Sequence, residues 1–341
     1  MLKRLQTILI TLALCVGTVW AGDVEDGNDA LTRKDYVTAL KKYKIAAAKN
    51  DAYAQRQVGN MYSEGLGIKQ DYTEAVRWYK LAAAQDHASA QHNLGVMYDS
   101  GHGVAQDYTE AVRWYRLAAA QGRAGAQYNL GVKYDNGQGV VQDYTEAVRW
   151  YKLAAAQGHA SAQSNLGTLY DSGQGVVQDY AEAVRWYRLA AAQGGASAQY
   201  NLGIKYDKGQ GIAQDYAEAV RWYKLAAVQG GANAQYSLGD MYDSGQGVVQ
   251  DYAEAVRWYK LAAAQGNASA QYNLGAKYAN GRGVVQDYMR AHMWFNLAAV
   301  NGDSLAVKNR DLVAKMMTPQ QIAEAQKLAR ECQARNFKNC D

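Results

Sequence analysis

The sequence predicts an all-α protein, a solenoid of helix-turn-helix repeats with capping helices at its C-terminal end. An Asp-Tyr pair recurs every 36 residues, at Asp71, Asp107, Asp143, Asp179, Asp215, Asp251 and Asp287. A fixed period of this length is typical of tandem-repeat architectures. The only proline in the chain is Pro319, so no proline interrupts a helix of the repeated region.

Each repeat is expected to contain two helices joined by a short loop. One copy predicts a first helix over Ala88–Ser100, a loop that starts at Gly101, and a second helix that opens at Asp107. Asp107 is typical of an N-cap, and Glu110 three residues later predicts a capping box in which the glutamate reaches back to the cap. Gly122 suits the left-handed position that ends a helix.

Apolar residues at helical spacing predict a buried stripe along each helix of the pair. Gly95 has no side chain, so two helices can approach closely there. Glu74, Arg77 and Lys80 fall on a solvated face with charged neighbours. The expected core positions are Ala90, Leu94, Met97 and Tyr98 in the first helix, and Ala75, Tyr79 and Ala83, flanked by Val76 and Trp78, in the second.

The chain divides into four predicted regions: a signal peptide (1–21), a degenerate N-terminal capping repeat (22–53), about seven repeats (54–303) and a C-terminal cap with a tail (304–341). The N-terminal repeat has Lys42 where later copies carry Trp, and Asn28 begins its first short helix. Met293 and Asn296 replace charged residues of earlier copies, which indicates that helices over 304–316 and 319–335 cover the last repeat. Thr318 is the expected N-cap of the final helix.

The first residues predict export to the periplasm or the outside. Lys3 and Arg4 precede an apolar run that is too short to span a bilayer, and a cleavage site follows near Ala21. Cys15 would suit a lipoprotein, but Leu14 is bulky where such signals carry a small residue. Without Lys3 and Arg4 the formal charge falls from +4 to +2, which argues against nucleic acid as the partner.

Two cysteines, Cys332 and Cys340, remain in the mature chain. They lie eight residues apart, so in an oxidising compartment they can close one small disulfide. Two free thiols and intermolecular pairing are the alternatives.

No catalytic or metal-binding motif stands out. His87, His92 and His102 lie close in sequence, but their spacing does not place all three on one helix face. The chain contains no Ser-x-x-Lys, Lys-Thr-Gly, Gly-x-Ser-x-Gly or phosphate-binding loop. The Gly-x-Gly pair that recurs in each copy is expected to be the interhelix turn. No cofactor, metal or enzymatic activity is therefore predicted.

The segment Ala126-Gln127-Tyr128-Asn129-Leu130-Gly131, with Tyr134, Gly137, Gly139, Asp143-Tyr144 and Ala147-Val148-Arg149-Trp150-Tyr151, resembles the Sel-one-like repeat (SLR) family. The resemblance covers about residues 35–303. It implies a right-handed α/α superhelix, related to tetratricopeptide repeats, whose first helices line a concave face. It also implies an adaptor that holds protein partners in envelope, signalling or host-contact roles.

Candidate partner-binding residues lie on the first helix of each repeat, opposite its core stripe. They form a row of Tyr beside a row of Asp, and Tyr is enriched in binding hot spots. Two alternatives stay open: the Asp carboxylates accept from loop N–H groups around Gly137 and Gly139, and the Tyr rings pack against each other. The candidates are His92, Val96, Asp99, Tyr128, Asp135, Asp171, Tyr200, Asp207, Tyr236, Asp240, Asp243 and Tyr272.

A neighbouring row of residues is expected at the edge of the core, where its changes adjust packing or let a lysine reach water along the surface. This row is Met97, Lys133, Leu169, Lys205, Met241 and Lys277.

Two functions fit these patterns. The first is an exported, non-enzymatic scaffold that binds a protein or extended peptide, favouring Lys or Arg because of the acidic row. The second is a cell-wall-directed enzyme, or a protein that binds peptidoglycan or β-lactams. The second function is suggested only by cysteine-rich members of the family, which carry a disulfide in each repeat, whereas this chain has no repeat cysteines.

Overall fold

The computed structural model describes residues 22–300, 304–338 and 340, and this part of the chain contains helices and no strand. The predicted signal peptide lies outside the described residues. The helix bounds are α2 (Tyr36–Ala48), α3 (Ala52–Glu64), α4 (Tyr72–Ala83), α5 (Ala88–Ser100), α6 (Tyr108–Ala120), α7 (Ala124–Asn136), α8 (Tyr144–Ala156), α9 (Ala160–Ser172), α10 (Tyr180–Ala192), α11 (Ala196–Lys208), α12 (Tyr216–Val228), α13 (Ala232–Ser244), α14 (Tyr252–Ala263), α15 (Ala268–Asn280), α16 (Tyr288–Val300), α17 (Ser304–Ala314) and α18 (Pro319–Ala334).

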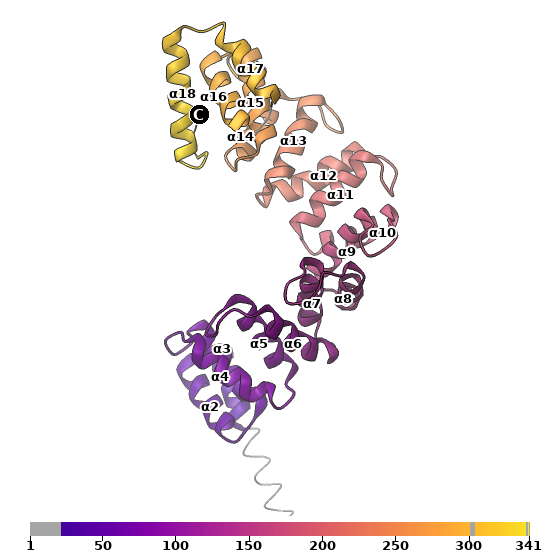
Figure 1. Ribbon diagram of the computed structural model, residues 1–341, viewed down its shortest axis with the longest axis vertical. Coiled ribbons are helices and arrows are strands. Elements are labelled where there is room, and N and C mark those ends of the chain that lie inside the picture. The colour runs from indigo at the N-terminus through magenta and orange to yellow at the C-terminus, as the bar shows by residue number, and fades with distance from the viewer. Residues whose placement is uncertain (1–21, 301–303, 339, 341) are drawn as a thin grey trace, which may run out of the picture. The chain divides into compact units, whose positions relative to one another are not determined.

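Two compact units make up the chain, and each consists of successive helix pairs (Figure 1). The first unit holds residues 1–162 and 174–176, and the second holds 163–173 and 177–341. Within a repeat the odd-numbered helix from α3 to α15 is the first helix, and the even-numbered helix that follows it is the second. This arrangement confirms the predicted all-α class and the helix-turn-helix repeat.

The N-cap of the second helix is the predicted aspartate, but the glutamate three residues later does not make the predicted contact. Asp107 accepts a hydrogen bond from the backbone N–H of Glu110 at 3.0 Å, and Gly101 ends the preceding helix with a φ of 71°. The carboxylate of Glu110 does not return to the cap, so the predicted capping box is wrong. It binds Arg113 at 2.6 Å instead, because the guanidinium one turn later offers a charge-assisted hydrogen bond.

A glycine notch in each first helix receives a buried aromatic ring from the second helix. A Cβ atom at Gly95 would lie 2.6 Å from the ring of Tyr115, and one at Gly131 would lie 2.6 Å from the ring of Tyr151. Both tyrosines are almost fully buried. The predicted close approach is therefore confirmed, and its cause is the ring that crosses the glycine.

Tryptophan and glutamine join successive repeats. Trp114 packs against the core cluster of α4 and α5, which includes Ala83 of the preceding repeat and Leu94 of its own repeat. The buried Gln127 donates a hydrogen bond from Nε2 to the carbonyl oxygen of Ala119 in the preceding repeat at 3.2 Å, and it accepts one from Nε2 of Gln157 in its own repeat at 2.8 Å. Equivalent glutamine pairs recur within the repeats of each unit. The first-helix glutamine of each pair is buried, and in several repeats it also donates to an alanine carbonyl of the preceding repeat, which helps to fix how the repeats stack.

Charged side chains cover the outer end of the N-terminal repeat. Residues 22–32 are helical, so this helix begins earlier than the predicted start at Asn28. Lys42 stands where later copies carry Trp, and it pairs with Asp26 at 2.5 Å and with Asp23 at 3.6 Å. A polar pair replaces the tryptophan because no earlier repeat offers an apolar core to pack against.

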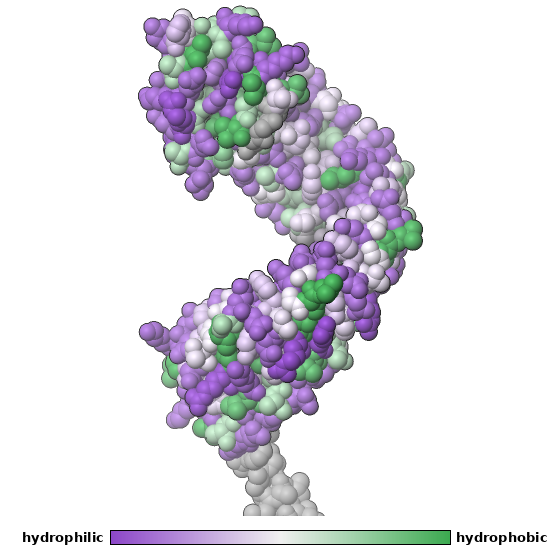
Figure 2. Space-filling view, viewed as in Figure 1, coloured by the Kyte–Doolittle hydropathy of each residue, from purple (hydrophilic) through white to green (hydrophobic). Residues whose placement is uncertain are grey.

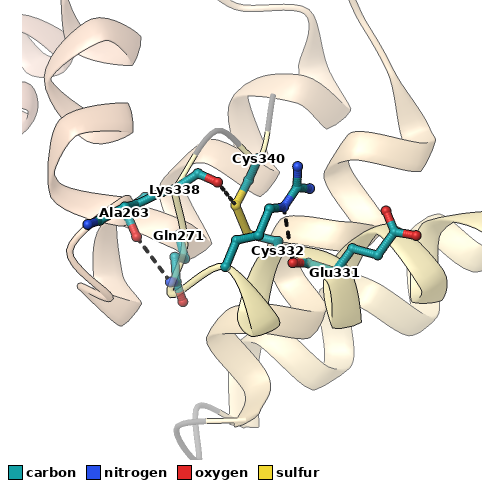
Figure 3. The surroundings of a disulfide bond; sticks show 7 residues. Ala263, Gln271, Glu331, Cys332, Lys338 and Cys340 are labelled. Carbon is teal, nitrogen blue, oxygen red and sulfur yellow. Dashed lines mark hydrogen bonds between the residues drawn. A yellow bond between two sulfur atoms is a disulfide. The ribbon is translucent and has the colours of Figure 1, made fainter.

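The C-terminal helices cover the last repeat, as predicted. Met293 is 1% exposed, and α17 and α18 both pack on α16. Thr318 and Gln321 form a capping box at the start of α18. A disulfide joins Cys332 in α18 to Cys340, close to Gln271 of α15 (Figure 3).

The surface is mainly polar. Figure 2 shows hydrophilic side chains over most of the visible face of each unit, with hydrophobic side chains in small separate groups. In the described residues we find no helix with the length and apolar character needed to cross a membrane.

We expect Gly131→Ala to destabilise the protein by roughly 1–3 kcal/mol, because the new methyl group would push the buried ring of Tyr151 out of place. Gly125 in the same helix is the matched control. A Cβ there would meet only ordinary contacts with His92, and alanine improves helix propensity by up to about 1 kcal/mol. Chemical denaturation of both variants tests this. Equal stability of the two would show that the notch does not constrain the helix pair.

Candidate partner-binding face

The candidate site is the first-helix face, defined by the side chains that occupy the places of Ser89, His92, Val96 and Asp99 in each repeat. All four are partly buried rather than fully exposed. Tyrosine from the second helix flanks them, and Val96 packs on the core cluster of α6 and α7, which includes Val112 of its own repeat and Leu130 of the next. The Val96 place therefore supports packing between repeats.

The Asp row is held by hydroxyl groups and lysines. Asp99 accepts a hydrogen bond from the hydroxyl of Tyr115 at 3.1 Å and forms an ion pair with Nζ of Lys133 from the next repeat. The expectation that loop N–H groups near Gly137 and Gly139 hold these carboxylates is wrong. The Tyr115 ring crosses the glycine notch and delivers its hydroxyl to the aspartate one turn later.

The lysine row is also placed differently from the prediction. The side chain of Lys133 is only 5% exposed, so it does not extend along the surface to water. Its Nζ also donates to Oε1 of Gln138 at 2.9 Å and lies 4.6 Å from the ring centre of Tyr108. A buried ammonium needs such partners, because removing it from water without them is costly.

These ion pairs occur at every second junction between repeats. The pairs are Asp99 with Lys133, Asp171 with Lys205, and Asp243 with Lys277. At the other junctions an apolar residue, Leu169 or Met241, stands in the lysine place. Asp135 and Asp207 then accept from a tyrosine hydroxyl, at 3.0 and 3.2 Å, and no ion pair reaches them within the described residues.

Asp240 is a further carboxylate for which the described residues show no ion pair. Its Oδ1 accepts from the hydroxyl of Tyr259 at 2.6 Å and from Nδ2 of Asn273 at 3.1 Å. Burial raises the pKa of Asp240, and the hydroxyl of Tyr259 only partly offsets that effect. No ion pair joins Asp240 to a lysine or arginine in the part of the chain that the structure describes, and other copies carry Val96, Val132 or Ile204 at this place.

The aromatic row rests on the buried tyrosines of the second helices. Tyr128 lies 5.9 Å from Tyr151, and Tyr200 lies 5.8 Å from Tyr223, measured between ring centres. Tyr236 stands in the same way 6.0 Å from Tyr259. Each of these three rings therefore has one side against a buried tyrosine.

His92 and Tyr272 are less accessible members of this row. Burial, followed by the charge of Arg123, lowers the pKa of His92 to about 4, so its imidazole is neutral at pH 7. Nδ2 of Asn129 lies 3.2 Å from its Nε2. Tyr272 accepts a hydrogen bond from Asn309 of α17 at 2.7 Å, so the C-terminal cap occupies that place.

The histidines have separate neighbours. His87 caps α5 through Nδ1, and His102 stacks on Tyr72 with ring centres 4.6 Å apart. In the described residues no three or more His, Cys, Asp or Glu side chains gather in a way that could hold a metal ion.

A cavity of about 230 Å³ opens beside Tyr200, between the starts of α11 and α13. Sequence reasoning missed it. The available signal was Gly231, which stands where other copies carry His87, Arg123 or His159.

We expect Asp240→Asn to stabilise the protein at pH 7. The raised pKa of Asp240 means that the folded state takes up a proton at higher pH than the unfolded state. The charged form thus costs stability at neutral pH, and the cost fades as the pH falls through the raised pKa. The advantage of Asp240→Asn should shrink accordingly when melting is followed from pH 7 to about pH 4.

Asp243→Asn in the same helix is the control, because it breaks the ion pair with Lys277 and should lower stability at pH 7. Stabilisation by both substitutions, or by neither, would contradict the assignment of Asp240 as an uncompensated charge.

The chain is similar to known proteins in both sequence and structure. Sel1 repeats match seven successive segments: 52–87, 88–122, 124–159, 160–195, 196–231, 232–267 and 268–303. A Sel1 repeat protein from Oxalobacter formigenes is 40% identical, with a TM-score of 0.64, over 70% of this chain and 98% of that chain.

Two further solved structures are similar over much of the chain. A protective antigen of uropathogenic Escherichia coli strains, which displays an SLR fold, is 31% identical over 89% of this chain and 81% of that chain, with a TM-score of 0.44. Immunity protein Pa5087 from Pseudomonas aeruginosa is 23% identical over 62% of this chain and 81% of that chain, with a TM-score of 0.39. No curated protein matches the chain. The sequence and the helix pairs together show that this chain belongs to the Sel1 repeat family.

Proposed function

We propose that the protein is a non-enzymatic scaffold that binds an extended, basic segment of a partner protein along the first-helix face within a unit. The observation that carries this proposal is a set of carboxylates that form no ion pair within the described residues: Asp135 in the first unit, and Asp207 and Asp240 in the second. The tyrosines Tyr128, Tyr200 and Tyr236 stand on the same helices. A peptide with Lys or Arg would supply the missing positive charge and cover the tyrosine rings.

The energetics of Asp240 support a role in binding. Its burial costs stability, and a valine or isoleucine at this place would avoid that cost, as in other repeats. A residue that lowers stability without a compensating ion pair is often kept for function. Asp99, Asp171 and Asp243 are already neutralised by lysine, so we exclude them from the proposed contact set.

We further propose that the protein acts outside the cytoplasm. The basic start and short apolar run of residues 1–21 support export, and the disulfide between Cys332 and Cys340 suits an oxidising compartment. The alternative of a cell-wall-directed enzyme has no nucleophile and base motif in the sequence to support it.

A labelled peptide of alternating Lys and Ala should bind the protein, and a Glu-Ala peptide of the same length should not. We expect binding to weaken several-fold when salt is raised from about 50 to about 300 mM, because exposed charges are screened. Met241→Lys places a lysine opposite Asp207, as Lys277 stands opposite Asp243, and should weaken peptide binding on the order of fivefold. Fluorescence anisotropy measures both effects.

Glu218→Gln is the matched control. It changes the net charge by the same amount, but it lies on a second helix and pairs with Arg221. If Glu218→Gln weakens binding as much as Met241→Lys, the peptide responds to overall charge and the first-helix face is not the binding site.

A further inference from the structure

One repeat of the first unit shows how a side chain can cover a tyrosine of the first-helix face. The imidazole of His159 stacks on the ring of Tyr128, with ring centres 4.6 Å apart and an angle of 22° between the planes. The same imidazole accepts a hydrogen bond through Nδ1 from the backbone N–H of Ala162 at 3.3 Å. A single planar ring thus covers the tyrosine and caps the next first helix.

Two repeats later the tyrosine is present and the covering ring is missing. Tyr200 stands in the place of Tyr128, and Gly231 stands in the place of His159. Within the described residues, no side chain caps α13, which begins just after Gly231. The cavity of about 230 Å³ lies at this point, and its lining includes Tyr200, Ser197, Ala226 and Asn233.

The neighbouring repeats do not share this gap. Next to Tyr236 the corresponding residue is Asn267, which caps α15 at 2.9 Å and donates to Asn233 at 3.1 Å. Gly195 also stands in the place of His159, but the neighbouring first helix has Ser164 in the place of Tyr128. No aromatic ring therefore lies beside Gly195 at this place. Of Tyr128, Tyr200 and Tyr236, therefore, Tyr200 alone combines an aromatic ring with an adjoining helix start that has neither a covering ring nor a side-chain cap.

We propose that this cavity binds the imidazole of a histidine from the protein partner, stacked on Tyr200 and accepting an N–H of the first turn of α13. The inference rests on the proposed scaffold function and specifies one side chain of its partner. Phenylalanine would fill the space but leave the N–H groups without an acceptor, and a carboxylate would accept them but could not stack. Imidazole does both, as His159 shows.

The bound imidazole has to be neutral, because only a neutral ring offers an acceptor nitrogen. Burial lowers the pKa of His159 in the same arrangement. Binding at Tyr200 should therefore weaken as the pH falls below the ordinary histidine pKa of about 6.5.

Free imidazole and pyrrole are the first probes. They have nearly the same shape, but pyrrole has no acceptor nitrogen. We expect imidazole at pH 7.5 to give saturable NMR shift changes at the ring of Tyr200, with an affinity in roughly the millimolar range. Pyrrole should bind several-fold more weakly. Equal binding of the two, or no saturable change at Tyr200, would overturn the proposal.

Two substitutions provide matched variants. Gly231→His should fill the cavity from within and abolish imidazole binding, since the φ of −65° and ψ of 109° at Gly231 match those of His87 in its own repeat, −72° and 102°. His159→Gly should open a second site at Tyr128 and double the number of imidazoles bound. Unchanged binding in Gly231→His would contradict the assignment.

A peptide test separates this inference from the proposed function. Replacing one alanine of the Lys-Ala peptide by histidine should strengthen binding several-fold to the natural protein but not to Gly231→His. If the Lys-Ala peptide binds and histidine adds nothing, the histidine site is wrong and the scaffold function stands. If imidazole binds but neither peptide does, the basic-peptide function is wrong.

Discussion

The glycine notch is the constraint on which each repeat depends. Because Gly95 has no side chain, the ring of Tyr115 crosses the first helix closely enough to fill the space between the two helices. The ring is long enough that its hydroxyl emerges at Asp99 on the far side. One aromatic contact therefore holds the helix pair together and also orients the carboxylate of the candidate face. Packing and function are coupled at this place, so a change in the notch should disturb both.

Other side chains determine how one repeat stacks on the next. Tryptophan supplies apolar contact with the preceding core. Apolar contact is not directional, so by itself it does not fix the position of one repeat relative to the next. The buried amides, such as that of Gln127 with the carbonyl oxygen of Ala119 in the preceding repeat, must find their partners or remain unsatisfied, and this requirement fixes the stacking register. The alternating ion pairs, such as Asp99 with Lys133, add a second requirement at every other junction. Because these pairs recur every two repeats, the aspartates of the row alternate between those paired with lysine and those that form no such pair in the described residues.

The places where nearly identical copies differ are the informative ones. Asp240 puts a carboxylate, without an ion pair in the described residues, where every other repeat keeps an uncharged residue, and Gly231 removes a ring that covers a tyrosine elsewhere. Both changes lie in the second unit, near Tyr200 and Tyr236. The other repeats serve as internal controls, because they show the same backbone with the gap filled or the charge absent.

The sequence by itself determined the repeat, its two helices, most of its caps and its core stripes, because these depend on local periodicity and on residue types that occupy fixed places in every copy. It also identified the cap over Met293 from lost charges. It could not assign partners across 15 to 40 residues of chain: the hydroxyl of Tyr115 at Asp99, the ammonium of Lys133 beside it, or the glutamine ladder. Those contacts depend on how far one helix lies from another, and only the tertiary structure decides that distance. For the same reason, only the tertiary structure decides which carboxylates form no ion pair and which tyrosine ring has no covering side chain.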